Sequence, residues 1–178
     1  VVIEGGGAVQ TAQEPASVPE PTTPGSAVEI DRTALPTDAP VVNSSIFDDS
    51  SGLDITWSLT DNDVTTGWIR EDEAQVGRVT VMLGEVHGVI GIAWLTAAGG
   101  CGEPIGIEYT IDGDTWIAID PVTVTGAAGE AMSWRYQRLT LEARALRITF
   151  APDAPGQATS GCLAEVRVWG NPLVIEEA

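Results

Sequence analysis

The sequence predicts an all-β protein, a sandwich or jelly roll that is preceded by an extended, proline-rich arm. Short apolar stretches of strand length recur after residue 41, and most of them alternate apolar with polar residues. No stretch keeps a helical period over three turns. Glycine, aspartate, asparagine and proline separate the apolar stretches, and these residues favour turns. The spacing is that of a β-sandwich of about 130 residues.

Residues 1–40 are rich in proline, alanine, threonine, glycine and glutamate and contain no aromatic side chain. Such a segment cannot bury enough apolar surface to offset the entropy lost on ordering, so we expect an extended arm or linker. Every aromatic residue of the chain follows Val41. We therefore place the folded domain at residues 41–172 and a short tail at residues 173–178.

About seven or eight strands are expected within this domain. The clearest hairpin surrounds Asp112 and Gly113, because a D-G pair supplies the positive φ angles that a tight reversal requires. The segments with strand-like patterns are residues 77–83, 88–95, 105–111, 115–120, 134–141, 145–150 and 163–170.

Length and charge exclude several classes of partner. The 178 residues suit one domain with a tail, and 26 acidic against 8 basic side chains give a formal charge of −18. This charge opposes binding to nucleic acid and to anionic membrane surfaces. No apolar run approaches the roughly 20 residues that span a bilayer. We expect neither a nucleic-acid partner nor membrane insertion.

Five motifs, in a fixed order, carry a family resemblance. They are "DNDVTTGW" (residues 61–68), "VTVMLG" (79–84), "IEYTIDGDTW" (107–116), "WRYQRLTL" (134–141) and "CLAEVRVWG" (162–170). Together they resemble the discoidin, or coagulation factor V/VIII type C, superfamily, with Asn62 replacing the glycine of its D-G-D-x-x-T-x-W signature and Met82 replacing the aspartate of its D-L-G motif. The resemblance implies a galactose-binding-like jelly roll, the architecture of many bacterial carbohydrate-binding modules.

The resemblance also implies a structural calcium ion. Carried over by position, its ligands are the side chains of Asp61, Asp63, Thr66 and Glu165, with backbone carbonyls near Leu59 and Ala164. Calcium takes six to eight oxygen ligands and accepts carboxylates, hydroxyls and carbonyls together. The alternative is a metal-free turn, because Asp, Asn and Thr also bond the backbone of their own loop.

The leading functional hypothesis is a non-catalytic, extracellular module that binds carbohydrate or another cell-surface ligand. Trp57, Arg70 and Trp134 are candidate ligand contacts, although a core position for each tryptophan and a solvated surface position for the arginine remain open. Other aromatic residues are expected in the core, and these are Trp68, Trp116, Tyr136, Phe150 and Trp169.

The alternative hypothesis is a structural subunit of an extracellular filament or surface assembly. The arm would then pack on, or donate its "VVIE" strip (residues 1–4) to, an identical neighbouring subunit. Enzymatic activity is the weakest hypothesis. His87 is expected in a turn after a strand, and the sequence has no Gly-x-Ser-x-Gly motif.

Cys101 and Cys162 are expected to form a disulfide, because a jelly roll brings their two positions together. The loop of about 60 residues that they close would contribute roughly 4 kcal/mol in the chain-entropy model. The alternative is a pair of free, buried cysteines.

Overall fold

The computed structural model describes residues 35–69, 75–96, 104–119, 124–125, 134–151 and 163–173, of which 124–125 only in the backbone. The predicted all-β fold is confirmed. In this part of the chain, no helix is long and apolar enough to cross a membrane. The elements are β1 (Ser45–Asp48), α1 (Thr56–Thr60), β2 (Gly77–Thr96), β3 (Gly106–Thr110), β4 (Ile117–Ala118), β5 (Val124–Thr125), β6 (Trp134–Phe150) and β7 (Leu163–Pro172).

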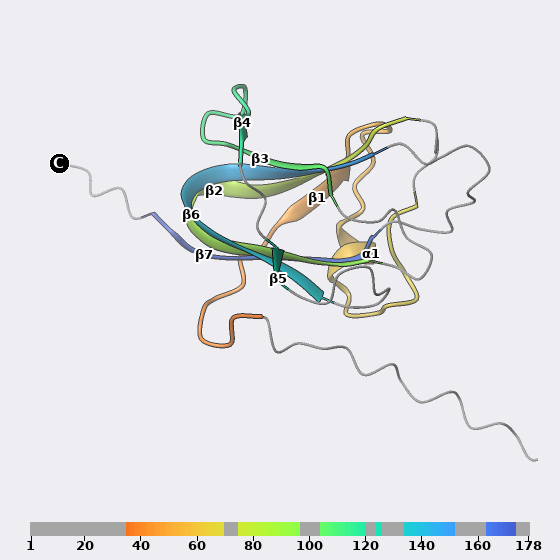
Figure 1. Cartoon of the computed structure of the whole chain (residues 1–178), viewed down its shortest axis with the longest axis horizontal. Helices are drawn as coiled ribbons and strands as arrows, with labels where there is room; N and C mark the ends of the chain where they lie inside the picture. The colour runs from red at the N-terminus through yellow and green to blue at the C-terminus, as the bar shows by residue number, and fades with distance from the viewer. Residues whose placement is uncertain are drawn as a thin grey trace, which may run out of the picture.

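Two long strands, β2 and β6, build both layers of the sandwich. They pair antiparallel along almost their whole length, with a register shift between Met82 and His87. The half of β2 before the shift pairs with β1, and the matching half of β6 pairs with β3, which pairs with β4. The half of β2 after the shift pairs with β7, and its partner on β6 pairs with β5. Figure 1 shows β2 and β6 curving round at one end to join an upper layer, with β3 and β4, to a lower layer, with β7 and β5.

The sequence divided each of these long strands into two. Strand β2 contains both predicted segments 77–83 and 88–95. Strand β6 contains both predicted segments 134–141 and 145–150. The segment between residues 83 and 88 contains glycine, and we therefore expected the chain to reverse there. Gly84 does have a positive φ of 82°. It lies in the irregular stretch of β2, where the sheet bends over instead of the chain turning back.

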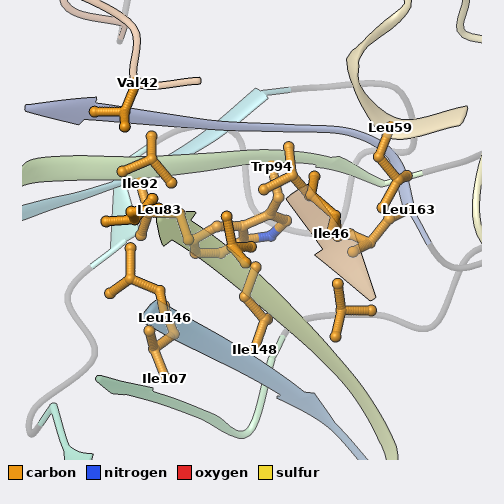
Figure 2. Packing of buried hydrophobic residues seen from close by; sticks show 14 of the residues in the cluster. Val42, Ile46, Leu59, Leu83, Ile92, Trp94, Ile107, Leu146, Ile148 and Leu163 are labelled. Atoms are coloured by element: carbon orange, nitrogen blue, oxygen red, sulfur yellow. The ribbon is translucent and has the colours of Figure 1, made fainter. Parts of the chain in front are cut away.

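The main core lies between the two layers. Trp94 is fully buried, and Figure 2 shows its ring among apolar side chains from both layers, including Ile92, Leu146 and Ile148. Trp68 and Phe150 also belong to this cluster, as the sequence predicts, and their ring centres lie 6.0 Å apart. Burial of a large apolar side chain contributes about 1.5–3 kcal/mol, so this cluster is the main stabilising element.

A second apolar cluster lies on the outer side of the lower layer. It contains Leu95, Trp134 and Trp169, whereas Trp94 and Val168, the residues before Leu95 and Trp169, face the main core. Leu35 and Ala39 pack against it, and Figure 1 shows their segment beneath the lower layer. The segment is anchored by the backbone, because Gly170 N donates to Pro40 O at 3.1 Å and Val42 N to Val168 O at 2.8 Å. Residues 35–40 therefore pack on the sandwich, although their composition placed them in the arm; residues 1–34 lie outside the described part of the chain.

Two expectations about single residues are wrong. His87 lies inside β2 and is 8% exposed, with Nδ1 2.9 Å from the carbonyl oxygen of Glu85. It was expected in a turn, because the bend of β2 resembles a turn in sequence. Trp116 is only partly buried and lies beside the guanidinium group of Arg147 instead of in the core.

Candidate functional site

Helix α1 presents Trp57 to solvent next to the predicted calcium loop. Ser58 and Leu59 are buried, whereas the Trp57 side chain is 69% exposed. The Asp54 carboxylate fixes the start of the helix, because its Oδ1 accepts hydrogen bonds from the backbone N–H and the hydroxyl of Thr56. The ring is therefore held on a short, anchored element and not on a loose loop.

The loop after α1 is closed by its own carboxylates. Asp61 accepts hydrogen bonds from the backbone N–H of Asp63, at 2.9 Å, and from the Thr66 hydroxyl, at 2.8 Å. Asp63 in turn accepts from the N–H and the hydroxyl of Thr65, at 2.9 and 2.6 Å. Asn62 has a φ of 62°, in the left-handed region that glycine and asparagine tolerate. This explains why asparagine can replace the glycine of the discoidin signature.

Gly67 and Trp68 fasten this loop to β7. The backbone N–H of Trp68 donates to Leu163 O at 2.8 Å, and a Cβ on Gly67 would lie 2.2 Å from that same oxygen. Only glycine allows this approach. The Trp68 indole N–H donates to the buried carboxylate of Asp48 at 2.9 Å, which fixes the ring from the other side. The "GW" pair thus places the loop beside Ala164 and Glu165.

Glu165 is a buried carboxylate at this junction. Its side chain is 1% exposed, and neither carboxylate oxygen has a hydrogen-bond partner among the described residues. Burial raises the pKa of Glu165 to about 7; the positive charge of Arg167 opposes this rise and the nearby Asp61 carboxylate adds to it. Arg167 also donates to the side-chain oxygen of Asn62. An unpartnered buried carboxylate is costly, so this position favours a cation.

The donor set fits calcium in chemistry. Asp61, Thr66 and Glu165 supply carboxylate and hydroxyl oxygens around the junction, and all of these are ligands that calcium accepts. The predicted cluster of three carboxylates is not seen: within residues 35–69 and the other described ranges, no three His, Cys, Asp or Glu side chains form a metal-binding group. Asp63 turns into its own loop towards Thr65. Calcium here would draw its other oxygens from carbonyls, such as those predicted at Leu59 and Ala164.

The other predicted site residues have different outcomes. Trp134 is 2% exposed and lies in the outer cluster, with the Arg167 guanidinium carbon 4.9 Å from its ring centre, so it offers no open ring to a ligand. Trp57 is open to solvent. Arg70, Cys101 and Cys162 lie outside the described residues, and the disulfide stays a prediction.

Sequence reasoning missed two features. The inward-facing Asp48 carboxylate was not among the predicted site residues, but the alternation of "SIFD" (residues 45–48) could have indicated a strand with Asp48 facing inward beside Ile46. The contact of Trp116 with Arg147 had no signal in the sequence, because the two residues meet only through the pairing of β3 with β6.

Comparisons with known proteins bear on the fold. No family model matches the chain, and no curated protein matches it either. Solved structures do match. The F5/8 type C domain of a Bacteroides fragilis protein is 14% identical, with a TM-score of 0.57 over 78% of this chain and 100% of that domain.

Two sugar-binding modules match over similar lengths. Chitosan-binding module 1 of a Paenibacillus chitosanase/glucanase, in a selenomethionine-labelled mutant form, is 18% identical, with a TM-score of 0.51 over 72% of this chain and 96% of that module. The CBM32 module of AlyQ, in complex with 4,5-unsaturated mannuronic acid, is 16% identical, with a TM-score of 0.52 over 72% of this chain and 97% of that module. The chain therefore has the jelly-roll fold of F5/8 type C, or discoidin-like, domains.

Proposed function

We propose that this protein is a non-catalytic, extracellular carbohydrate-binding module whose ligand contacts Trp57. The observation that carries the proposal is the exposed indole of Trp57 on an anchored helix, 69% open to solvent. An exposed ring on an anchored element can stack on a ligand without a rearrangement of the backbone. An aromatic face suits the apolar side of a sugar ring, and the Asp54 carboxylate at the start of α1 suits its hydroxyls.

The fold supports the same class of ligand. Two structures with this fold are a chitosan-binding module and a module in complex with 4,5-unsaturated mannuronic acid. Rigid sandwiches commonly present binding residues on the loops and short elements that connect their strands. Trp57 lies on such an element.

We further propose that calcium stiffens the loop beside α1. The ion would be held by Asp61, Thr66 and Glu165 with backbone carbonyls, and it would neutralise the buried Glu165. Thr66 already contacts the helix, because its hydroxyl lies 3.4 Å from Ser58 O. A fixed loop holds α1, and with it Trp57, in one orientation.

A glycan array with the whole chain tests the carbohydrate proposal. Wild-type protein should bind one or more glycans in the micromolar to millimolar range, and Trp57→Ala should weaken this binding at least tenfold without lowering the melting temperature. Val41→Ala is the matched control, because Val41 is also an exposed apolar residue, at 56%, but carries no ring. Wild-type protein that binds no glycan on the array would refute the proposal, and equal losses in both variants would exclude a specific role for Trp57.

The assembly hypothesis remains a prediction. The "VVIE" strip lies outside the described residues, so the hypothesis depends on experiments with the arm.

A further inference from the structure

The outer face of the upper layer carries a row of side chains that runs across five strands. Pairing in register places Phe47 beside Thr80, Thr80 beside Arg147, Arg147 beside Glu108, and Glu108 beside Ala118. The residues between them along each strand face the core; they are Ile46, Val79, Val81, Ile107, Leu146 and Ile148. The row therefore faces outward. At about 4.8 Å per strand it spans roughly 19 Å.

Arg147, at the centre of the row, lies beside the ring of Trp116 and two carboxylates. The guanidinium carbon of Arg147 lies 3.9 Å from the centre of the Trp116 ring. Arg147 Nε donates to Glu108 Oε2 at 3.0 Å, and its Nη1 lies 3.9 Å from Asp49 Oδ2. The side chains of Arg147 and Glu108 keep 19% and 29% of their surface exposed. An indole, a guanidinium and a carboxylate are thus held together at the surface.

The hairpin that carries Trp116 is fixed by its own hydrogen bonds. Asp112 Oδ1 accepts from the backbone N–H of Asp114 at 2.9 Å and from that of Thr115 at 2.8 Å. These bonds hold the pKa of Asp112 well below its usual range. Gly113 has the positive φ, 93°, that the turn requires. Figure 1 shows the β3–β4 hairpin rising from the upper layer, away from the lower one. The position of Trp116 is therefore set before any ligand arrives.

The two outer faces of the sandwich differ in what covers them. Residues 35–40 pack on the outer cluster of the lower layer. No described helix or strand packs across the outer face of the upper layer. Between Phe47 and Trp116 the face has a floor of three buried residues, Thr80, Thr149 and Ala145, and the larger side chains of Arg78 and Met82 lie beside this floor. This floor is largely buried. Partly exposed side chains of the face, those of Phe47, Trp116, Arg147 and Glu108, stand around it.

We propose that this surface, formed by Phe47, Thr80, Glu108, Trp116 and Arg147, is a second glycan-binding site that takes a short, uncharged oligosaccharide laid across the strands. The ring of Trp116 stacks on one sugar unit, and Glu108 and Arg147 hydrogen-bond its hydroxyls. This inference rests on the proposed carbohydrate-binding function but not on the site at Trp57, which lies on α1.

Charge selects an uncharged ligand. Two guanidinium groups, those of Arg147 and the exposed Arg78, and two carboxylates, those of Glu108 and Asp49, lie at this face, so it carries no net positive charge for a carboxylated or sulfated sugar. The formal charge of −18 also opposes polyanions at long range. An uncharged sugar does not need an unbalanced charge for binding, because carboxylate and guanidinium groups both form hydrogen bonds with hydroxyls.

NMR titration of the full chain tests the proposal directly. The probes are neutral N-acetylchitohexaose and cellohexaose, with oligomannuronate as the carboxylated comparison. Assigned indole N–H signals report Trp116 and Trp57 separately. At least one neutral oligosaccharide should shift the Trp116 signal with saturation, and it should do so also in Trp57→Ala. Oligomannuronate should shift it at least tenfold more weakly.

Variants of the surface provide the second readout. Trp116→Ala should weaken neutral-oligosaccharide binding at this site at least tenfold, and Glu108→Gln, which keeps the shape of the side chain, about three- to tenfold. Asp114→Ala, in the same hairpin, is the matched control and should have no effect. Neutral sugars that shift Trp57 but never Trp116 would overturn this inference and leave the proposed function intact. Wild-type protein that binds no sugar on the array or in the titration would overturn both.

Discussion

Glu165 is a residue at which burial and charge conflict. Its carboxylate is 1% exposed and lacks a hydrogen-bond partner in the described part of the chain, and its pKa is raised from 4.5 to about 7. Between pH 4.5 and about pH 7, Glu165 keeps its proton in the folded protein and releases it in the unfolded chain. Stability without metal therefore falls as pH rises through this window.

Glu165→Gln should remove this pH dependence. At about 1.36 kcal/mol per pKa unit, the wild-type free energy of unfolding should fall by roughly 3 kcal/mol between pH 4.5 and pH 8, over and above the other titrating groups. The amide cannot ionise, so the variant should lose that part of the slope and be the more stable protein at pH 8 in chelator. Urea unfolding at both pH values measures this. An identical slope in the two proteins would show that Glu165 ionises normally when folded.

At the scale of elements, the sequence predicted the positions of the strands better than it predicted which face of each strand is buried. Alternation identified the strand segments of β2, β3, β6 and β7, because each has one face on the core. It could not show that the two halves of β2 are continuous, since a bend and a turn both use glycine. Trp116 was assigned to the core because a large aromatic ring is usually buried. Alternation could not correct this, because it shows that two strand faces differ but not which face a neighbouring layer covers.

The candidate site was predictable in its loop and not in its surroundings. The order of Asp61, Asp63 and Thr66 follows a sequence motif, so the turn and its hydrogen bonds could be expected. The side-chain direction of Asp63, towards Thr65, depends on the local backbone and could not. The exposure of Trp57 and the burial of Trp134 depend on packing between segments far apart in the chain, which one sequence does not contain.

The tie between the loop after α1 and β7 leads to the calcium prediction. Calcium that binds only the folded state should stabilise it by about 2.7 kcal/mol at a hundredfold excess over the dissociation constant. Chelator should then lower the melting temperature of wild-type protein. Asp61→Ala and Glu165→Ala should abolish the difference between calcium and chelator, and Asp114→Ala, an exposed aspartate of the β3–β4 hairpin, should keep it. Melting curves that coincide in chelator and in millimolar calcium would leave a hydrogen-bonded turn without a metal.

At the scale of the whole molecule, one sheet folded back on itself has two outer faces, and the chain treats them differently. Segment 35–42 covers the apolar face of the lower layer and pairs with β7 through Pro40 and Val42. The upper layer presents polar and aromatic side chains. The boundary between arm and domain therefore follows contact with the lower layer and not the change in composition at residue 41.

Two truncations separate the arm from the covering segment. Removal of residues 1–34 should leave the melting temperature within a few degrees of wild type, because every contact of the covering segment described above is made by residues 35–42. Removal of residues 1–41 also deletes Leu35, Ala39 and the Pro40 carbonyl that accepts from Gly170, and exposes Trp169. Loss of this packing should cost roughly 1–3 kcal/mol. Equal melting temperatures for the two truncated proteins would show that the covering segment does not stabilise the sandwich.

The same proteins test assembly through the arm. If the arm joins identical subunits, light scattering should detect oligomers of wild-type protein, and removal of Val1–Glu4 alone should dissociate them while the sandwich stays folded. The reason is that a donated strand acts through its backbone hydrogen bonds at a neighbour's sheet edge, so its loss leaves the fold of its own subunit unchanged. Oligomers that survive this short deletion but not removal of residues 1–34 would move the contact further along the arm. Oligomers that survive both would place it between sandwiches, and monomers throughout would exclude the filament hypothesis for this chain.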